Sequence, residues 1–188
     1  MKSETVLDPL ARPACDRLER AFVIRDRLHD LLNSNPASDE AAVLMSDFIR
    51  HARGALDRAV WGITPQRIRN RAPTDVAFPL HPHEPSYLAW AEMREQWYGP
   101  RVFEALRAMQ PFAASAPATR HPLGVLEYLS NVDSGELAGI TACGRLDRNG
   151  GDRTIVLDEA IDAIGPCIVA AVGCVLIAHA QDVRIRPN

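Results

Sequence analysis

Apolar and polar residues recur at helical spacing through the first third of the chain. Between residues 12 and 33, leucine, alanine and phenylalanine return every three to four positions among arginines and acids, which predicts an amphipathic helix. A second apolar stripe runs from residue 38 to residue 63 and begins at Ser38, a residue type that caps helix starts. Because only a short Asn-Ser-Asn-Pro segment separates the two runs, they predict an antiparallel helical hairpin.

Residues 64 to 86 are predicted to form an irregular loop. Four prolines between residues 72 and 86 prevent a long helix or strand there. Thr64 followed by Pro65 is typical of a helix start, so short turns that carry three arginines are expected up to Arg71. Residues 87 to 133 return to helical spacing in shorter pieces.

The pattern becomes typical of strands between residues 137 and 157. Within it, Asn149-Gly150-Gly151 is a sequence common in hairpin turns, so a small β-hairpin is expected. A last helix follows over residues 158 to 182. The chain is therefore predicted to be one mainly α domain over residues 1 to 188: an antiparallel bundle of four to six helices with a proline-rich loop and a small β-hairpin.

The last helix is unusually apolar, because no Asp, Glu, Lys or Arg occurs from Ala163 to Ala180. This length is at the lower limit for crossing a membrane. Gly165-Pro166, which predicts a kink or a break, and several alanines make the segment only moderately apolar. We expect it to be packed in the core or in an interface between copies of the chain, with a membrane anchor as the alternative.

Charge is unevenly distributed along the chain. The formal net charge of −3 and the pI near 6.1 argue against a protein that wraps nucleic acid along its whole surface. Between residues 50 and 71, however, six arginines face a single acid, Asp57. This face is either a solvated surface or a site for nucleic acid or phosphate. The candidate binding residues are Arg50, His51, Arg53, Arg58, Arg67, Arg69 and Arg71.

Other chemistry has weaker support in the sequence. The four cysteines have no metal-binding spacing and are expected to be small core residues in a reducing compartment. The first residues show no secretion signal, so a cytoplasmic location is expected. No phosphate-binding glycine loop or nucleophile motif occurs, and no cofactor is predicted.

One cluster has the residue types that bind metals. His81, His83 and Glu84 lie close together in the proline-rich loop, and with His121 or water they would offer ligands for zinc. The alternative is a solvated polar loop without metal, because no second pair of ligands with zinc-type spacing occurs.

Four short segments stand out by their order along residues 46 to 136. They are His51-Ala-Arg53-Gly-Ala-Leu-Asp57-Arg58, Phe78-Pro79, Gln110-Pro-Phe112 and His121-Pro-Leu followed by Asn131-Val-Asp133. They resemble motifs of an uncharacterised bacterial family, common in actinobacteria, that reads His-Asn-Leu-Arg-Ser-Ala-Leu-Asp-His, Phe-Pro-Ile, Gln-Pro-Tyr and Asn-x-Asp-Lys-His-Arg. The Arg-x-x-x-x-His part of that pattern is similar to the motif of the HEPN superfamily of RNases and nucleic-acid-associated domains.

Two departures from the family pattern bear on catalysis. Arg58 stands where the family has histidine, and Ser134-Gly135-Glu136 stands where it has Lys-His-Arg. An RNase of this kind needs an imidazole to move a proton and a guanidinium to stabilise phosphate charge. The resemblance therefore implies a degenerate member that binds without cleaving.

The sequence thus favours a non-enzymatic binding or assembly module that associates with itself, with RNA or a protein as the candidate partner and no membrane. The first alternative is a metal-independent RNase or toxin-like enzyme that uses Arg50, His51 and Arg53. The second alternative is a metal-dependent activity at His81, His83 and Glu84.

Overall fold

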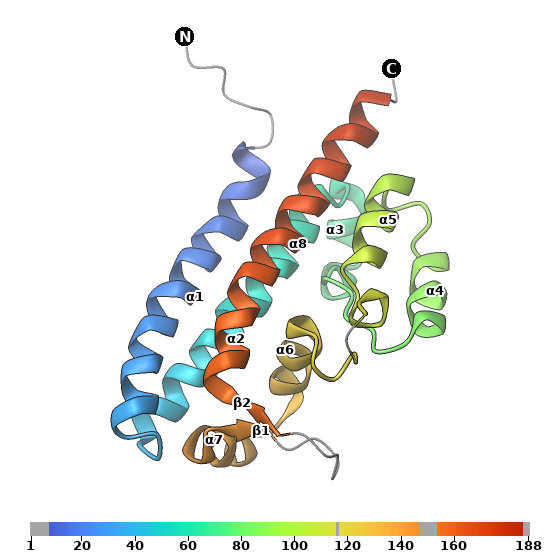
Figure 1. Ribbon diagram of the computed structural model, residues 1–188. Helices are drawn as coiled ribbons and strands as arrows, with labels where there is room; N and C mark the ends of the chain where they lie inside the picture. The colour runs from blue at the N-terminus through green and yellow to red at the C-terminus, as the bar shows by residue number, and fades with distance from the viewer. Residues whose placement is uncertain (1–7, 116, 147–153, 186–188) are drawn as a thin grey trace.

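The computed structural model describes residues 8–115, 117–146 and 154–185, and nearly all of its regular structure is helical (Figure 1). The α-helices within these ranges are α1 Asp8–Ser34, α2 Asp39–Ile63, α3 Gln66–Arg71, α4 Glu84–Glu92, α5 Pro100–Ala108, α6 Pro122–Asn131, α7 Ser134–Cys143 and α8 Leu157–Ile185. Two 3₁₀ turns, η1 Pro73–Asp75 and η2 Pro111–Ala113, and two strands, β1 Arg145–Leu146 and β2 Ile155–Val156, complete the described elements. The predicted mainly α bundle with a small antiparallel strand pair is confirmed, with more helices than the four to six expected.

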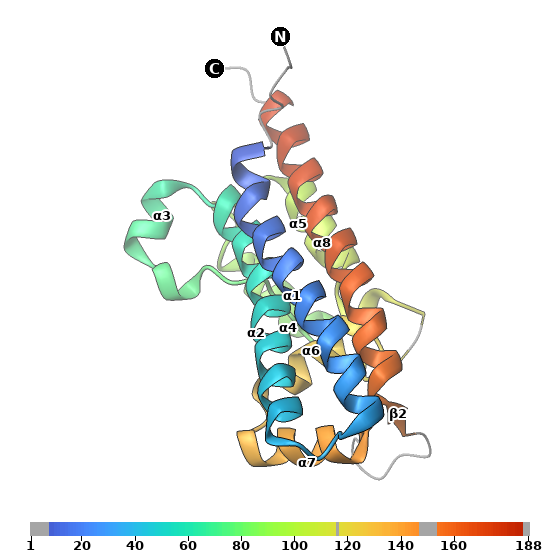
Figure 2. The same cartoon turned by 90° about the vertical axis from the view of Figure 1, so that its left-hand side faces the viewer.

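Three long helices, α1, α2 and α8, lie side by side and form one layer of the molecule (Figures 1 and 2). The predicted hairpin is α1 and α2, and its turn ends where Ser38 Oγ accepts the N–H of Ala41 at 3.1 Å. The apolar stripe of α2 is buried along its whole length and includes Phe48, Ala52 and Leu56. Burial of this stripe against both neighbours fixes which face of α2 remains available to a ligand.

The shorter helices α4, α5 and α6 lie on one side of these long helices (Figure 1), and the end of α8 holds α5 in place. Asp182, which is buried, accepts the backbone N–H groups of Arg101 at 3.4 Å and Val102 at 3.2 Å. A carboxylate in this position satisfies free N–H groups at the start of α5 and favours the positive end of its dipole. A Cβ atom at Gly99 would overlap this carboxylate, so only glycine fits.

The predicted β-hairpin over residues 137 to 157 is smaller than expected. Residues 134 to 143 form α7, which begins where Asp133 accepts the N–H of Glu136 at 2.8 Å and ends at Gly144, whose φ is 64°. Among the described residues of this region, Arg145 pairs with Val156 and Leu146 pairs with Ile155, in antiparallel orientation. The turn signal Asn149-Gly150-Gly151 lies outside the described residues.

The last helix does not break into two pieces, because α8 is one helix from Leu157 to Ile185 with Pro166 inside it. Pro166 and Asp162 are both exposed, so water can satisfy the Asp162 carbonyl that Pro166 leaves without a donor. By length and composition α8 is able to cross a membrane, and half of its most apolar stretch is buried in the protein. The other half forms an exposed apolar face that includes Val169 and Ile177.

The prediction that the cysteines are core residues is wrong. Cys15, Cys143 and Cys174 are exposed, and Cys167 is half-buried. Whether a cysteine on a long helix is buried depends on the face of the helix on which it lies, and Cys174 lies on the exposed face of α8.

The loop predicted over residues 64 to 86 contains the short helix α3, the turn η1 and an extended segment that enters the core, and its last three residues are the first turn of α4. Phe78, Pro79 and Leu80 are all buried. Gln110, fully buried after α5, accepts the N–H of His81 and donates to the carbonyl of Pro79, both at 2.9 Å. Buried backbone groups need such partners, and here a side chain supplies them.

Candidate functional site

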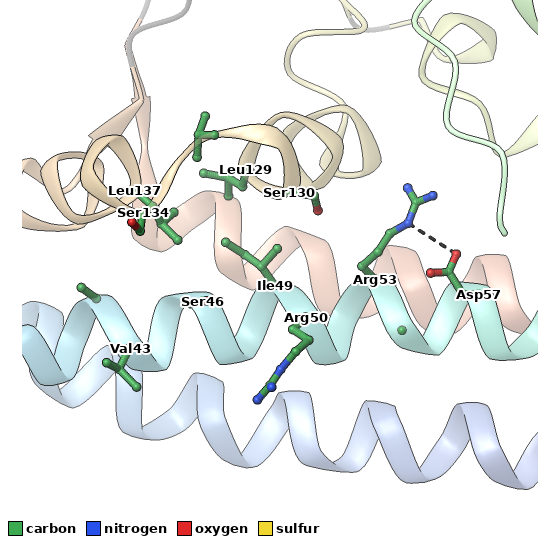
Figure 3. A pocket seen from close by; sticks show the side chains of 13 residues that line it. Val43, Ser46, Ile49, Arg50, Arg53, Asp57, Leu129, Ser130, Ser134 and Leu137 are labelled. Carbon is green, nitrogen blue, oxygen red and sulfur yellow. Dashed lines mark ion pairs between the residues drawn. The ribbon is translucent and has the colours of Figure 1, made fainter. Parts of the chain in front are cut away.

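Arg53 of α2 is a structural residue in this protein. Its guanidinium donates to Glu127 of α6 at 2.7 Å and to the carbonyl of Phe78 at 2.8 Å, and its Nε lies 3.4 Å from Asp57 (Figure 3). The side chain is only 22% exposed. It therefore ties three parts of the chain together, and the phosphate-binding role predicted for it would require it to leave two carboxylates.

Asp57 completes this cross-link from the other side of the extended segment. Its Oδ1 accepts the N–H of Phe78 at 2.9 Å, so Arg53 and Asp57 together satisfy both backbone groups of that residue. Burial raises the pKa of Asp57, while Arg53 and the Phe78 N–H oppose the increase. Asp57 is thus held by its surroundings and is poorly placed to exchange protons with a ligand.

A groove rich in arginine lies between α1 and the carboxyl half of α2. It has a volume of about 580 Å³ and is lined by Arg17, Arg50, Gly54, Asp57, Arg58, Trp61 and Val76. A Cβ atom at Gly54 would meet the Arg17 side chain at 3.7 Å, which is ordinary contact. Arg17 therefore lies across the surface of α2 at Gly54 and brings a charge from α1 into the predicted arginine cluster.

His51 borders this groove. Its Nδ1 lies 3.3 Å from Nη1 of Arg17, and because a guanidinium can only donate, Nδ1 must accept. Burial lowers the pKa of His51, as do the charges of Arg17, Arg50 and Arg20, while Asp47 opposes them. These surroundings favour the neutral imidazole, and the lowered pKa reflects a positive field made by two helices.

The remaining predicted arginines lie on α3, which stands away from the three long helices (Figure 2). The Arg69 guanidinium lies 5.8 Å from the centre of the Trp61 ring, so α3 touches the wall of the arginine groove. Arg67 and Arg71 line a neighbouring pocket of about 460 Å³ with Trp97. The seven predicted residues are thus split: Arg53 is internal, and the other six lie along one side and the end of α2 and on α3.

Most of the arginines in this region form no ion pair with an acid, which is also true of Arg94 and Arg101 among the described residues. Arg50 pairs with Asp47 at 2.6 Å, although it remains 66% exposed. In residues 8–115, 117–146 and 154–185, no ion pair is formed by any of six arginines: Arg17, Arg20, Arg58, Arg67, Arg69 and Arg71. We call these six residues, with Trp61 and Trp97, the arginine surface.

The predicted metal ligands are not brought together. Glu84 pairs with Arg107, His83 is exposed at the start of α4, and the His81 ring packs near Tyr87 and Trp90. His121 instead accepts the N–H of Leu123 at 3.3 Å at the start of α6. Within the part of the chain that the structure describes, no three His, Cys, Asp or Glu side chains are grouped to hold a metal ion.

Sequence reasoning missed Arg17, Glu127 and the role of Gln110. Arg17 was predictable in principle, because a hairpin that turns near residues 35 and 36 places residue 17 opposite residue 54. Glu127 comes from a helix distant in the sequence, and nothing local marks it as the partner of Arg53.

No protein-family model, curated protein sequence or solved structure matches the chain. The HEPN-like resemblance therefore stays a prediction.

Proposed function

We propose that this protein is a non-enzymatic binding module that holds single-stranded RNA on its arginine surface. The observation that carries the proposal is that Arg17, Arg50 and Arg58 line one hollow with Trp61, that Arg69 lies over this ring, and that Arg67 and Arg71 line a second hollow with Trp97. Of these arginines, all but Arg50 form no ion pair in the described residues. Guanidinium groups without carboxylate partners keep their charge available for phosphate, with which they form two parallel hydrogen bonds.

The shape of the surface favours a chain over an isolated phosphate. One arginine-lined hollow contains Trp61 and the other contains Trp97, and Arg69 lies over the first of these rings. Alternation of arginine with aromatic rings is typical of surfaces that bind single strands, because phosphates and exposed bases recur along the ligand. A net charge of −3 for the whole chain is compatible with this, since Asp57 is the only acid among the described residues that line the two hollows.

The proposal assigns no cleavage to this site. The residue that the family motif would place at the phosphate, Arg53, is bound to Glu127 and Asp57 instead. His51 lies close to Arg17, but Arg58 occupies the position at which the motif has a second imidazole. RNA incubated with the protein should stay intact on a denaturing gel, with or without Arg58→His. Cleavage without added metal that His51→Ala abolishes would support the RNase alternative instead.

The same proposal includes self-association through the exposed face of α8. Val169 and Ile177 are 48% and 55% exposed, and they share this face with Ala170 and Cys174. The face carries no charge between Ala163 and Ala180, so an apolar partner surface suits it. A second copy of α8 supplies such a surface, since contacts between identical faces are the usual way homodimers form.

RNA binding is tested by fluorescence anisotropy with a labelled single-stranded oligouridine at low salt. Arg17→Ala combined with Arg58→Ala should weaken binding by about tenfold or more, because two phosphate contacts are lost. The matched control is Arg27→Ala with Arg107→Ala, which changes net charge equally but removes arginines that pair with Glu40 and Glu84. Absence of wild-type binding, or equal weakening in the control, contradicts the proposal.

A further inference from the structure

A second groove adjoins the arginine groove along α2, and its chemistry is different. It lies between α2 and the region where α6 ends and α7 begins (Figure 3). Its volume is about 650 Å³, within the range of small-molecule sites, which run from roughly 300 to 1,000 Å³. The two grooves share Arg50, Gly54 and Asp57 as lining residues. One continuous depression therefore follows the outer face of α2.

The far part of this groove is mainly apolar, although Ser46, Ser130 and Ser134 also line it (Figure 3). Ile49, Leu129 and Leu137 line it and are buried against the core, while Val43 lines it and is 59% exposed. Val43 and Arg50 are seven residues apart on one helix, so the apolar part extends for roughly 10 Å along α2. A ligand in this part would remove the Val43 side chain from water, which is favourable for an apolar chain.

The near part of the groove is charged, and one guanidinium there is accessible. Arg53 and Asp57 are bound to each other, to Phe78 and, for Arg53, to Glu127. Among the described residues Arg50 forms an ion pair with Asp47 alone, and it is 66% exposed at the boundary of the two grooves. Arg17 and Arg58 lie just beyond it in the adjoining groove, which makes this end the positive one.

We infer that this groove binds a small amphipathic anion, with its apolar chain along Val43, Leu129 and Leu137 and its anionic head group on Arg50. The groove has apolar residues along its length and an accessible guanidinium at one end, and this arrangement matches a ligand with an apolar chain and one charge at its end. A carboxylate or a phosphate monoester would both satisfy Arg50, since both accept two parallel N–H bonds from a guanidinium. A neutral ligand of the same shape would leave that interaction unused.

This site is distinct from the proposed RNA surface, because Val43 and Leu137 belong to one and Arg17, Arg58 and the tryptophans to the other. The two are close enough to interfere, since the head group would occupy the boundary beside Arg17. An amphipathic anion bound here would therefore weaken RNA binding without filling the arginine surface.

The inference is tested by isothermal titration of the full chain with decanoate and with decyl phosphate, which distinguish the two head groups, and with decanol as the neutral counterpart. We expect saturable binding of at least one anion at one site per chain and binding of decanol that is weaker by about tenfold or more. Val43→Asp should abolish anion binding, and Arg50→Gln should weaken it by about tenfold. The control is Val23→Asp, an equally exposed valine on α1 outside the groove, which should bind like wild type.

Three results would overturn this inference without affecting the RNA proposal. Neither anion binding saturably, decanol binding as tightly as the anions, or Val43→Asp binding as wild type does would each remove the groove as an amphiphile site. Anisotropy with oligouridine on the same Val43→Asp protein separates the two sites: unchanged RNA binding with lost decanoate or decyl phosphate binding supports the inference. Circular dichroism of each variant verifies that a loss of binding is not a loss of fold.

Discussion

His51 records the electrostatic character of the arginine groove. Burial and the charges of Arg17 and Arg50 lower its pKa from the usual 6.5. Removal of one of these charges with Arg17→Ala should move the pKa back toward 6.5, as measured by an NMR titration of the ring protons. Arg27→Ala, which removes an arginine elsewhere on α1, should leave the titration unchanged. An Arg17→Ala titration that coincides with wild type would show that Arg17 does not act on the groove.

The direction of this shift also predicts a pH dependence of stability. Because the pKa of His51 is lower in the folded protein, the folded state favours the neutral ring. The resulting contribution to stability is complete above about pH 6.5 and is lost as the pH falls through the lowered pKa. His51→Gln should therefore lose less stability than wild type between pH 7 and pH 5 in urea denaturation. Equal losses in the two proteins would contradict the shift.

At the residue scale, several polar side chains of the kinds that also occur in binding and active sites have a structural role here. Arg53 and Asp57 bind the carbonyl and the N–H of Phe78, and Gln110 binds the next backbone groups of the same segment. Sequence alone could not assign these roles, because a side chain that satisfies a buried backbone and one that binds a ligand have the same chemistry. Only the path of residues 78 to 81 through the core separates the two.

At the scale of elements, the junction between α8 and α5 gives a sharp test of packing. Gly99→Ala would place a methyl group into the Asp182 carboxylate that caps α5, and we expect a loss of about 1 to 3 kcal/mol in the free energy of unfolding. Gly139→Ala on α7 is the control, because a Cβ there meets nothing within 4 Å. That change should be neutral or stabilising by up to about 1 kcal/mol, since alanine favours helix. Equal stabilities of the two variants in urea denaturation would show that the capped junction is not formed.

The long elements were predictable because their spacing is strong, and the short ones were not. The hairpin of α1 and α2 follows from two apolar stripes and a proline-containing break. Residues 137 to 143 were expected to be a strand because a short apolar run fits either structure. The information that decides for a helix lies just before it: Asp133 followed three residues later by Glu136 is a helix start, and the side chain of Asp133 makes that cap.

At the scale of the whole molecule, α8 has one face in the core and one face on the surface. Val172 is 4% exposed and Ile177 is 55% exposed, so the same substitution at the two positions should have different effects. Val172→Asp would bury an unpaired carboxylate and should cost about 3 kcal/mol or more in unfolding free energy. Ile177→Asp should fold normally and should shift the protein to monomer in size-exclusion chromatography with light scattering.

The outcome of this comparison separates the three locations considered for α8. Leu88→Asp on α4, at a similarly exposed apolar position, is the control and should keep the oligomeric state of wild type. A wild-type protein that is monomeric removes the self-association proposal. Recovery of wild-type protein in the membrane fraction, lost on Ile177→Asp, would instead favour the membrane alternative.

The central claim is that the arginine surface binds a phosphate chain, and the salt dependence of binding tests it most directly. The logarithm of the oligouridine binding constant should fall linearly with the logarithm of salt concentration, with a slope of about −0.7 for each phosphate contacted. The Arg17→Ala, Arg58→Ala variant should have a slope about 1.4 smaller in magnitude than that of wild type, and the Arg27→Ala, Arg107→Ala control should keep the wild-type slope. A wild-type slope near zero, or the same slope in all three proteins, would contradict the account.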